Sequence, residues 1–225
     1  MLITTKGIIF RVTKYRETSI IVNIYTEQLG LNSYIVNGVR AAKGKYKIGH
    51  FEPLNLVEII AYHKPGREIE RLTEIKSAHP LHNIKLDIYK STMSMFLVEV
   101  LNKCLVEHDK NEALFYFLYN AILTLENTTK NNNFHLQFML KLTSYLGFGI
   151  HDSKMFIGQS NNSLFYATEA NNLVLQALIE SDLSDVLKIT RDQRQNILND
   201  ILIYYRLHLE MSKLKSLEVL QTIFK

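Results

Sequence analysis

The chain has 225 residues, of which 47% are hydrophobic and 21% charged, a composition typical of globular proteins that excludes a disordered chain. No apolar run reaches the roughly 20 residues needed to cross a bilayer. The N-terminal residues lack the charged-then-apolar layout of a signal peptide. The single cysteine, Cys104, excludes an internal disulfide. We therefore expect a soluble cytoplasmic protein.

Positive charge is concentrated in the first third of the chain. Residues 1–80 hold 12 Lys and Arg against 7 Asp and Glu, whereas residues 81–225 hold 14 against 15. A compact basic module beside a near-neutral one indicates a polyanionic partner more strongly than the overall charge does.

Residues 1–80 predict a β-domain with alternating apolar residues. Ile8, Phe10 and Val12 are expected to share one face of the first strand, because side chains alternate along a strand. Strands are expected over residues 7–12, 20–26, 31–36, 54–63 and 69–77. Five short strands in about 80 residues favour a closed barrel of the OB type, since closure removes exposed sheet edges.

From residue 81 the periodicity changes, and we expect an all-helical domain over residues 81–225. Helices are expected over residues 84–106, 111–125, 134–146, 173–181, 190–210 and 216–224. One buried face of the first helix is expected to comprise Ile88, Met95, Val98, Leu101 and Leu105. The polar run 126–133 is expected to be a loop, and a short hairpin is expected around Ser163–Ala167.

The sequence contains no recognisable catalytic motif. No Gly-rich phosphate loop, GxSxG or HExxH pattern occurs. The eight histidines are scattered, and Cys104 lies among apolar residues, as expected for a small buried hydrophobe. We therefore expect a protein that is not an enzyme. The alternative is a site assembled from scattered histidines and carboxylates, which a pocket with converging titratable groups would favour.

The most distinctive segment is residues 37–49, which contain three glycines, Tyr46 and no acidic residue. Its cations are Arg40, Lys43, Lys45 and Lys47. In one interpretation the cations contact phosphates and release counterions, while Tyr46 stacks on a base and adds about 1–3 kcal/mol. In the other, the loop is solvated and the tyrosine packs back onto the barrel.

A second basic group, Arg11, Lys14 and Arg16, lies near the first predicted turn. Strand alternation places Arg11 on the outside of the barrel. We hypothesise that this turn and the 37–49 loop border one groove. Tyr15 and Tyr34 are further candidates for base stacking, with barrel packing as the alternative.

Residues 7–19, Gly-Ile-Ile-Phe-Arg-Val-Thr-Lys-Tyr-Arg-Glu-Thr-Ser, resemble the N-terminal signature of the RecO family of recombination mediators. Tyr15, Glu17 and Ser19 match its Tyr-x-Glu-x-Ser/Asp turn. The resemblance continues through Tyr25–Glu27, Gly30, Asn37–Arg40, Phe51–Leu54, Leu142–Phe148, Tyr204–His208 and Leu214–Leu217. It covers nearly the whole chain, and the order and spacing of the motifs carry it.

This resemblance implies an OB barrel, a helical domain and a role in recombinational repair at the nucleoid. Members of the family bind single- and double-stranded DNA and anneal complementary strands. They engage the acidic, apolar C-terminal tail of the single-strand-binding protein. With a RecR-type partner they help a RecA-type recombinase displace that protein, without hydrolysing ATP.

An acidic tail with apolar terminal residues requires an apolar groove rimmed by cations. Candidate rim residues are Arg191, Arg194, Arg206, Lys213 and Lys215, with a solvated helix face as the alternative. A different function also stays open, that of an OB-type module that binds RNA or protein without annealing. Competition between DNA and RNA would separate the two.

Many relatives carry a four-cysteine zinc site just after the helix that ends in Leu-Gly-Phe/Tyr. In this chain residues 150–172 contain no cysteine. Structural zinc needs four ligands, which are usually thiolates in paired spacing. We therefore expect no zinc and no other cofactor, with side-chain packing in its place.

Overall fold

The computed structural model describes residues 1–41, 44–105, 109–129, 131–160 and 162–224. Two compact units divide the chain, and the division runs through two long helices. The barrel unit comprises residues 1–86 and 100–122, and the helical unit comprises residues 87–99 and 123–225. Within the described part of the chain, no helix combines the length and apolar character needed to cross a membrane.

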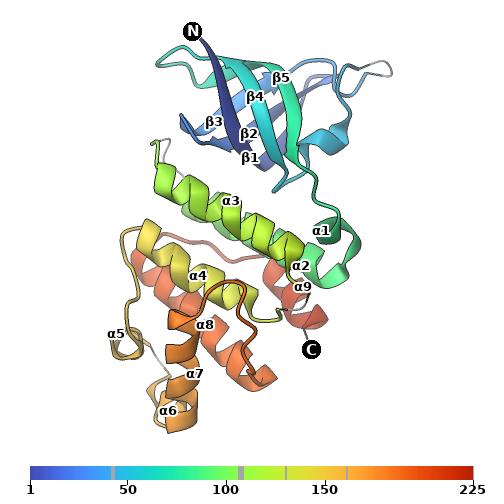
Figure 1. Cartoon of the computed structure of the whole chain (residues 1–225). Helices are drawn as coiled ribbons and strands as arrows, with labels where there is room; N and C mark the ends of the chain where they lie inside the picture. The colour runs from blue at the N-terminus through green and yellow to red at the C-terminus, as the bar shows by residue number, and fades with distance from the viewer. Residues whose placement is uncertain (42–43, 106–108, 130, 161, 225) are drawn as a thin grey trace. The chain divides into compact units, whose positions relative to one another are not determined.

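Five strands of the barrel unit close into a barrel (Figure 1). The strands are β1 (Leu2–Tyr15), β2 (Ser19–Thr26), β3 (Gly30–Val36), β4 (Leu56–Tyr62) and β5 (Ile69–His79). Neighbours follow the order β1-β2-β3-β5-β4, with β4 paired back onto β1. This order confirms the predicted five-stranded OB-type barrel.

The barrel is closed by a short parallel pairing between β3 and β5. Tyr34 is paired with Glu70 there, and both side chains are buried. Glu70 Oε1 lies 2.6 Å from His63 Nδ1 and accepts a hydrogen bond from the backbone N–H of Lys64 at 3.1 Å. A buried carboxylate is costly without such partners. The closing pair therefore depends on the β4–β5 turn, which supplies both groups.

The first strand departs from simple alternation. A bulge between Ile9 and Arg11 shifts the pairing of β1 with β2. As a result Ile9 and Val12 join the interior cluster, while Phe10 stacks on Tyr25 at 5.6 Å outside it. The expectation that Ile8, Phe10 and Val12 share one face is therefore wrong, because a bulge adds one residue and changes the face of those beyond it.

Phe10 and Tyr25 are covered by helical residues of the same unit. Tyr25 stacks on Phe115 with ring centroids 6.4 Å apart. Asn102 Nδ2 donates to the backbone carbonyl of Phe10 at 3.1 Å, which satisfies an acceptor at the bulge. The barrel unit thus has a second apolar layer on the outer face of β1 and β2.

Helical elements follow the barrel, several of them short (Figure 1). They are α1 (Asn83–Leu86), α2 (Ile88–Cys104), α3 (Glu112–Asn127), α4 (Phe134–Tyr145), α5 (Ser153–Gly158), α6 (Ser163–Tyr166), α7 (Glu169–Glu180), α8 (Arg191–His208) and α9 (Ser216–Ile223). In the helical unit α4 packs against α7 and α8, and its residues from Phe134 to Leu140 are all buried. The all-helical expectation for this region is confirmed.

Local residues define the C-terminal end of α4 and the N-terminal end of α8. Gly147 adopts φ of 86°, and the N–H of Phe148 donates to the carbonyl of Thr143, which ends α4 in the geometry that favours glycine. Thr190 and Gln193 form a reciprocal capping box at the start of α8.

Two expectations about the helices are wrong. The stretch 84–106 is not one helix, because Asp87 Oδ1 accepts from the N–H groups of Tyr89 and Lys90 and caps a new helix, α2. Its buried face is displaced in part, since Leu101 and Leu105 of the expected face are buried. Ile88 and Met95 are 59% and 58% exposed, whereas the interior residues are Met93, Phe96, Leu97, Val100 and Leu101. The sequence of α2 contains two apolar stripes. The buried stripe is the one whose residues recur every three or four positions along the helix. Val106, the expected end, lies outside the described residues.

The segment expected to form a hairpin is helical. Ser163–Tyr166 is a single helical turn, α6, and α7 begins at Glu169 rather than at residue 173. Tyr166 is buried and its hydroxyl donates to Asp200 Oδ2 of α8 at 2.7 Å. Burial raises the pKa of the Asp200 carboxyl, which the hydrogen bond from Tyr166 partly offsets. Tertiary packing against α8 therefore decides the local structure, which the polar sequence did not reveal.

The described residues of the polar run 126–133 form a loop from Thr128 onward, as expected, and this loop is partly buried. Glu126 and Asn127 continue α3, while Lys130 lies outside the described residues. Asn131 and Asn133 are buried, and their amide groups donate to the carbonyls of Leu183 and Leu187 at 3.0 and 2.8 Å. These bonds replace backbone pairing for the irregular segment between α7 and α8.

His135 is buried at 1% exposure in the helical unit, between the rings of Phe96 and Phe224. Burial, with a smaller contribution from the Arg194 cation, lowers the pKa of His135 to about 3. The folded protein therefore holds this histidine neutral at pH values where the unfolded chain protonates it.

We expect the unfolded chain to bind more protons at His135 than the folded chain between about pH 6.5 and 3. The contribution of the neutral ring to the free energy of unfolding is therefore fully present above about pH 6.5. It falls as the pH is lowered through this window, by up to about 1.4 kcal/mol per pH unit. Urea unfolding of wild type and His135→Gln at pH 7 and pH 5 measures it. The variant should lose less stability on acidification, whereas the exposed control His151→Gln should match wild type. Equal losses in all three proteins would contradict the assignment.

Candidate nucleic-acid interface

Residues 37–49, here called the basic loop, are hydrogen-bonded to the β1–β2 turn. The backbone N–H of Arg40 donates to the carbonyl of Thr18 at 3.0 Å, and its guanidinium Nη1 donates to the carbonyl of Arg16 at 3.4 Å. Ser19 Oγ and Asn37 Oδ1 lie 3.0 Å apart at the start of the loop. Two segments more than 20 residues apart in sequence are therefore held together by bonds that do not depend on a ligand.

A cleft of about 620 Å³ lies where these segments meet, here called the loop cleft. Its lining residues are Val12, Lys14, Ile20, Val39, Arg40, Ala41, Gly44, Tyr46, Lys47 and Ile48. Among the described residues, no carboxylate lines it. Lys14 from β1 and two cations of the loop thus border one apolar-floored cleft, as the groove hypothesis requires.

The other cations of the two groups have different positions. Arg11, Arg16 and Lys45 are exposed but do not line the loop cleft. Arg16 holds φ of 50°, a left-handed conformation that is uncommon for a residue with a Cβ, and its guanidinium lies 5.2 Å over the ring of Tyr15. Lys43 lies outside the described residues.

Tyr46 is packed against the barrel. Its hydroxyl donates to the carbonyl of Thr73 at 3.3 Å, and its ring meets Phe51 edge-on at 6.3 Å. The ammonium of Lys45 lies 5.0 Å over the ring, and the pKa of Lys45 is raised by its hydrogen bond with Tyr46. The tyrosine therefore matches the packing interpretation, and a base would need to displace Lys45 to stack there.

Of the two further aromatic candidates, Tyr34 is excluded from stacking. Tyr34 is fully buried inside the barrel. Burial, with a smaller contribution from the Glu70 charge, raises the pKa of its phenol. It is part of the barrel core, which is the alternative that the sequence left open.

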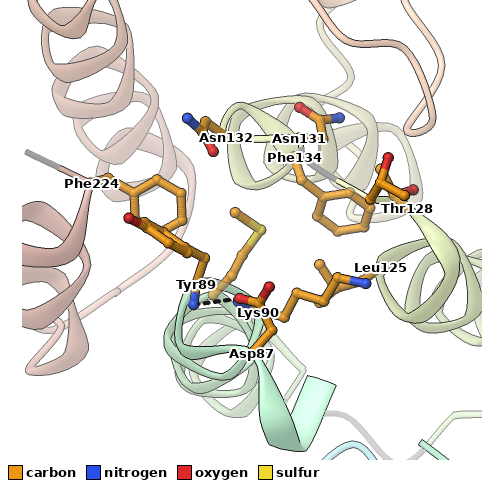
Figure 2. A pocket seen from close by; sticks show the side chains of 11 residues that line it. Asp87, Tyr89, Lys90, Leu125, Thr128, Asn131, Asn132, Phe134 and Phe224 are labelled. Carbon is orange, nitrogen blue, oxygen red and sulfur yellow. Dashed lines mark hydrogen bonds between the residues drawn. The ribbon is translucent and has the colours of Figure 1, made fainter. Parts of the chain in front are cut away.

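The helical unit contains an apolar pocket of about 240 Å³. Figure 2 shows Phe224 and Tyr89 on one side of it, facing Phe134 and Leu125 on the other. The rings of Tyr89 and Phe224 meet edge-on at 5.6 Å. Lys90 stands at the rim, with its ammonium held 2.6 Å from the carbonyl of Glu126.

Phe224 also lines a second, smaller hollow of about 30 Å³. This arginine hollow is lined by His135, Arg191, Arg194, Gln195, Leu198, Leu220, Gln221 and Phe224. His135 Nδ1 is buried and has no hydrogen-bond partner among the described residues. Two of the five residues proposed to bind the partner's tail, Arg191 and Arg194, thus line one hollow together with apolar side chains. The buried Nδ1 of His135 belongs to the same hollow.

The other candidate tail residues do not line this hollow. Arg206 is exposed on α8, and Lys213 forms an ion pair with Glu218 at 3.1 Å. The backbone N–H of Lys215 donates to Glu99 Oε1, which fixes the start of α9. Arg194 is itself engaged, since its Nε donates to Asn133 Oδ1 at 2.9 Å.

The described residues show little sign of catalytic chemistry. Burial raises the pKa of the Cys104 thiol to about 12, so the thiol is protonated at neutral pH. Within the described ranges, no three His, Cys, Asp or Glu side chains gather in a way that could hold a metal ion.

Comparison with known proteins identifies the family. Residues 1–81 match the family model described as "Recombination protein O N terminal", and residues 85–218 match "Recombination protein O C terminal". The chain belongs to the RecO family. As a member, it has a role in DNA repair and recombination. The family consists of mediators and is not known for enzymatic activity.

Three relatives named DNA repair protein RecO illustrate the similarity. The protein of Christiangramia forsetii is 38% identical, that of Flavobacterium psychrophilum 37% and that of Bacteroides fragilis 34%. In each case the match covers 100% of this chain and 100% of the relative.

Proposed function

We propose that this RecO-family chain is a recombination mediator that binds single- and double-stranded DNA and anneals complementary strands. It helps to load a RecA-type recombinase onto DNA coated with single-strand-binding protein, acting at the nucleoid with a RecR-type partner. The observation that carries the proposal is the loop cleft, which gathers Lys14, Arg40 and Lys47 without a described carboxylate.

The mechanism that these residues support is electrostatic capture of the phosphate backbone. Each phosphate neutralised by a lysine or arginine releases condensed counterions, so affinity falls steeply with salt. Contacts made to the backbone leave the pairing edges of the bases available to a second strand. Arg11, Arg16 and Lys45 extend the positive field around the cleft, and Tyr46 supports its floor and offers a ring face when Lys45 moves. Lys43, which lies outside the described residues, adds a further positive charge to the sequence of the loop. No bond is made or broken, so the role requires no catalyst.

The arginine hollow and the neighbouring pocket support recognition of the acidic, apolar tail of the single-strand-binding protein. Both are lined by Phe224, so an apolar terminal side chain in the larger pocket lies beside cations in the smaller one. Arg191 is available to a carboxylate there, and Arg194 adds charge while it holds Asn133. Arg206, Lys213 and Lys215 serve at most as a surrounding positive field.

The region between α4 and α8 is proposed to fold without zinc. Asp200 accepts a hydrogen bond from Tyr166, and Ser160 and Asn162 are further hydrogen-bond partners of its carboxyl. Asp152 caps α5 through the N–H of Met155 at 2.8 Å. The Asp200 contacts tie α6 and the segment between α5 and α6 to α8, the task that a metal performs in a four-cysteine site.

Annealing is expected to depend on the loop cleft. Arg40→Gln/Lys47→Gln should slow the annealing of complementary oligonucleotides coated with single-strand-binding protein. It should also reduce the slope of log affinity against log salt by about 1.4 for a single strand, because two phosphate contacts are lost. Strand annealing followed by fluorescence, with anisotropy titrations at several salt concentrations, measures both.

Lys64→Gln/Arg67→Gln is the matched control, since it removes two exposed charges from the β4–β5 turn of the same unit. It should behave as wild type. If wild type fails to accelerate annealing, or if both variants are equally impaired, the mediator proposal is wrong.

Tail binding is expected to require Arg191. A synthetic acidic peptide with an apolar last residue and a free carboxylate should bind wild type. It should bind Arg191→Gln about tenfold or more weakly, because a hydrogen bond to a charged group contributes about 1.5–3 kcal/mol. Arg206→Gln removes the same charge from the same helix and should leave the affinity unchanged. Calorimetric titration of each protein with the peptide and its amidated form tests this, and equal binding of the two peptides would remove the site.

The absence of zinc has a direct test. Elemental analysis of the purified chain is expected to find well under one zinc per chain, and chelator treatment should leave the unfolding temperature unchanged. Asp200→Ala should lower that temperature, since it leaves the Tyr166 hydroxyl buried without its acceptor. Stoichiometric zinc would overturn the proposal.

A further inference from the structure

A second cleft in the barrel unit follows directly on the loop cleft. It has a volume of about 320 Å³ and lies between the 3-10 turn η1 (Ile48–Phe51), β4, the end of β5 and the segment up to α1. Here it is called the histidine cleft. Its lining residues are Lys47, Gly49, His50, Asn55, Leu56, Val57, Ile75, Lys76, Ser77, His79, Pro80, Leu81, His82 and Lys85.

The lining of the histidine cleft is basic. Three lysines and three histidines contribute to it, and among the described residues no carboxylate does. Two lysines have acidic partners outside the lining, with Lys76 2.7 Å from Glu58 and Lys85 2.6 Å from Glu52. Both pairs are solvent-exposed, and exposed ion pairs contribute only about 0–1 kcal/mol. A phosphate can therefore replace either glutamate at little cost.

The wall between the two clefts is fixed. Asn55 Nδ2 donates to the carbonyls of Gly49 and His50 at 2.9 and 3.2 Å. The carbonyl of Lys47 accepts from the backbone N–H of His50 at 3.1 Å and lies 3.0 Å from its ring Nδ1. The backbone that carries Lys47 and His50 is thus positioned before any ligand binds.

Lys47 lines both clefts, and the next two residues divide between them, with Ile48 in the loop cleft and Gly49 in the histidine cleft. We propose that a single-stranded nucleic acid in the loop cleft continues past Lys47 into the histidine cleft, where Lys76 and Lys85 bind its phosphates. The imidazoles of His50, His79 and His82 offer ring faces and polar nitrogens along this path. This inference rests on the proposed function and adds to it a second binding segment.

The occupant is a single strand because of the geometry of the path. A duplex has a persistence length of about 150 base pairs and cannot turn around one residue into a hollow of 320 Å³. A single strand bends at each nucleotide, and OB-type barrels bind about 4–16 nucleotides of it. Two clefts joined at Lys47 give a single strand a longer path than the loop cleft alone.

The test compares Lys76→Gln/Lys85→Gln with Lys64→Gln/Arg67→Gln, which removes the same charge elsewhere on the barrel unit. Each full-length protein is titrated with oligothymidylates of about 4 and about 16 nucleotides at several salt concentrations. For the longer strand the Lys76/Lys85 variant should lose about 1.4 from the salt slope, the value for two phosphate contacts to a single strand. Wild type should bind the longer oligonucleotide more tightly than the shorter one, and the Lys76/Lys85 variant should lose most of this difference. The control variant should match wild type.

Photocrosslinking supplies an independent readout. A 16-nucleotide strand with a photoreactive thymine near one end should attach to peptides that contain residues 76–85 of wild type. Circular dichroism checks that each variant is folded, which is expected because all four substituted side chains are exposed.

The outcomes separate the two proposals. If Arg40→Gln/Lys47→Gln weakens binding while Lys76→Gln/Lys85→Gln matches the control, the second segment is overturned and the mediator proposal stands. If wild type binds neither oligonucleotide, both proposals fail. The path would also be overturned if the Lys76/Lys85 variant lost as much affinity for a duplex as for a single strand, since a duplex cannot follow the path.

Discussion

The barrel depends on the parallel pairing of β3 with β5, because this pairing turns an open sheet of five strands into a closed one. The pairing spans only Ser33–Ile35 and Ile69–Arg71, and it places a buried carboxylate, Glu70, beside His63 and the N–H of Lys64. The chain leaves the barrel at the end of β3 and returns to it through the basic loop. The floor of the loop cleft is therefore the barrel core itself, through Val39 and Tyr46.

Much of the barrel could be predicted from the sequence, because a strand of a closed barrel buries one face and alternation reports that face directly. The bulge at Ile9–Arg11 could not be predicted, since it places Phe10 in an outer apolar layer with Tyr25 and Phe115. Nothing local in the sequence states that Phe10 has an outer partner about 100 residues later. For the same reason α2 was assigned the wrong buried stripe. Its sequence carries two stripes, and only tertiary packing selects one.

The sequence predicts the charges of the candidate site and the approach of its two segments, but not the packing of Tyr46 or the second cleft. Lysines and arginines without neighbouring acids are visible in residues 37–49, and hydrogen bonds from Arg40 to Thr18 and Arg16 explain their approach to the first turn. The packing of Tyr46 depends on Thr73, a contact across the barrel that composition does not reveal. The histidine cleft was missed because its basic residues are spread from Lys47 to Lys85, over η1, β5, α1 and the segments between them. Each of them is an ordinary surface residue when considered alone.

Arg16 illustrates a conflict between stability and binding at this surface. It holds a left-handed backbone conformation that glycine adopts without steric cost, and its charge lies beside the proposed DNA path. A redesign that optimises the turn for thermal stability would replace it with glycine or asparagine and would remove that charge. Such a protein would withstand heat better and handle DNA less well. Selection for robustness and selection for repair therefore act in opposite directions at this one position.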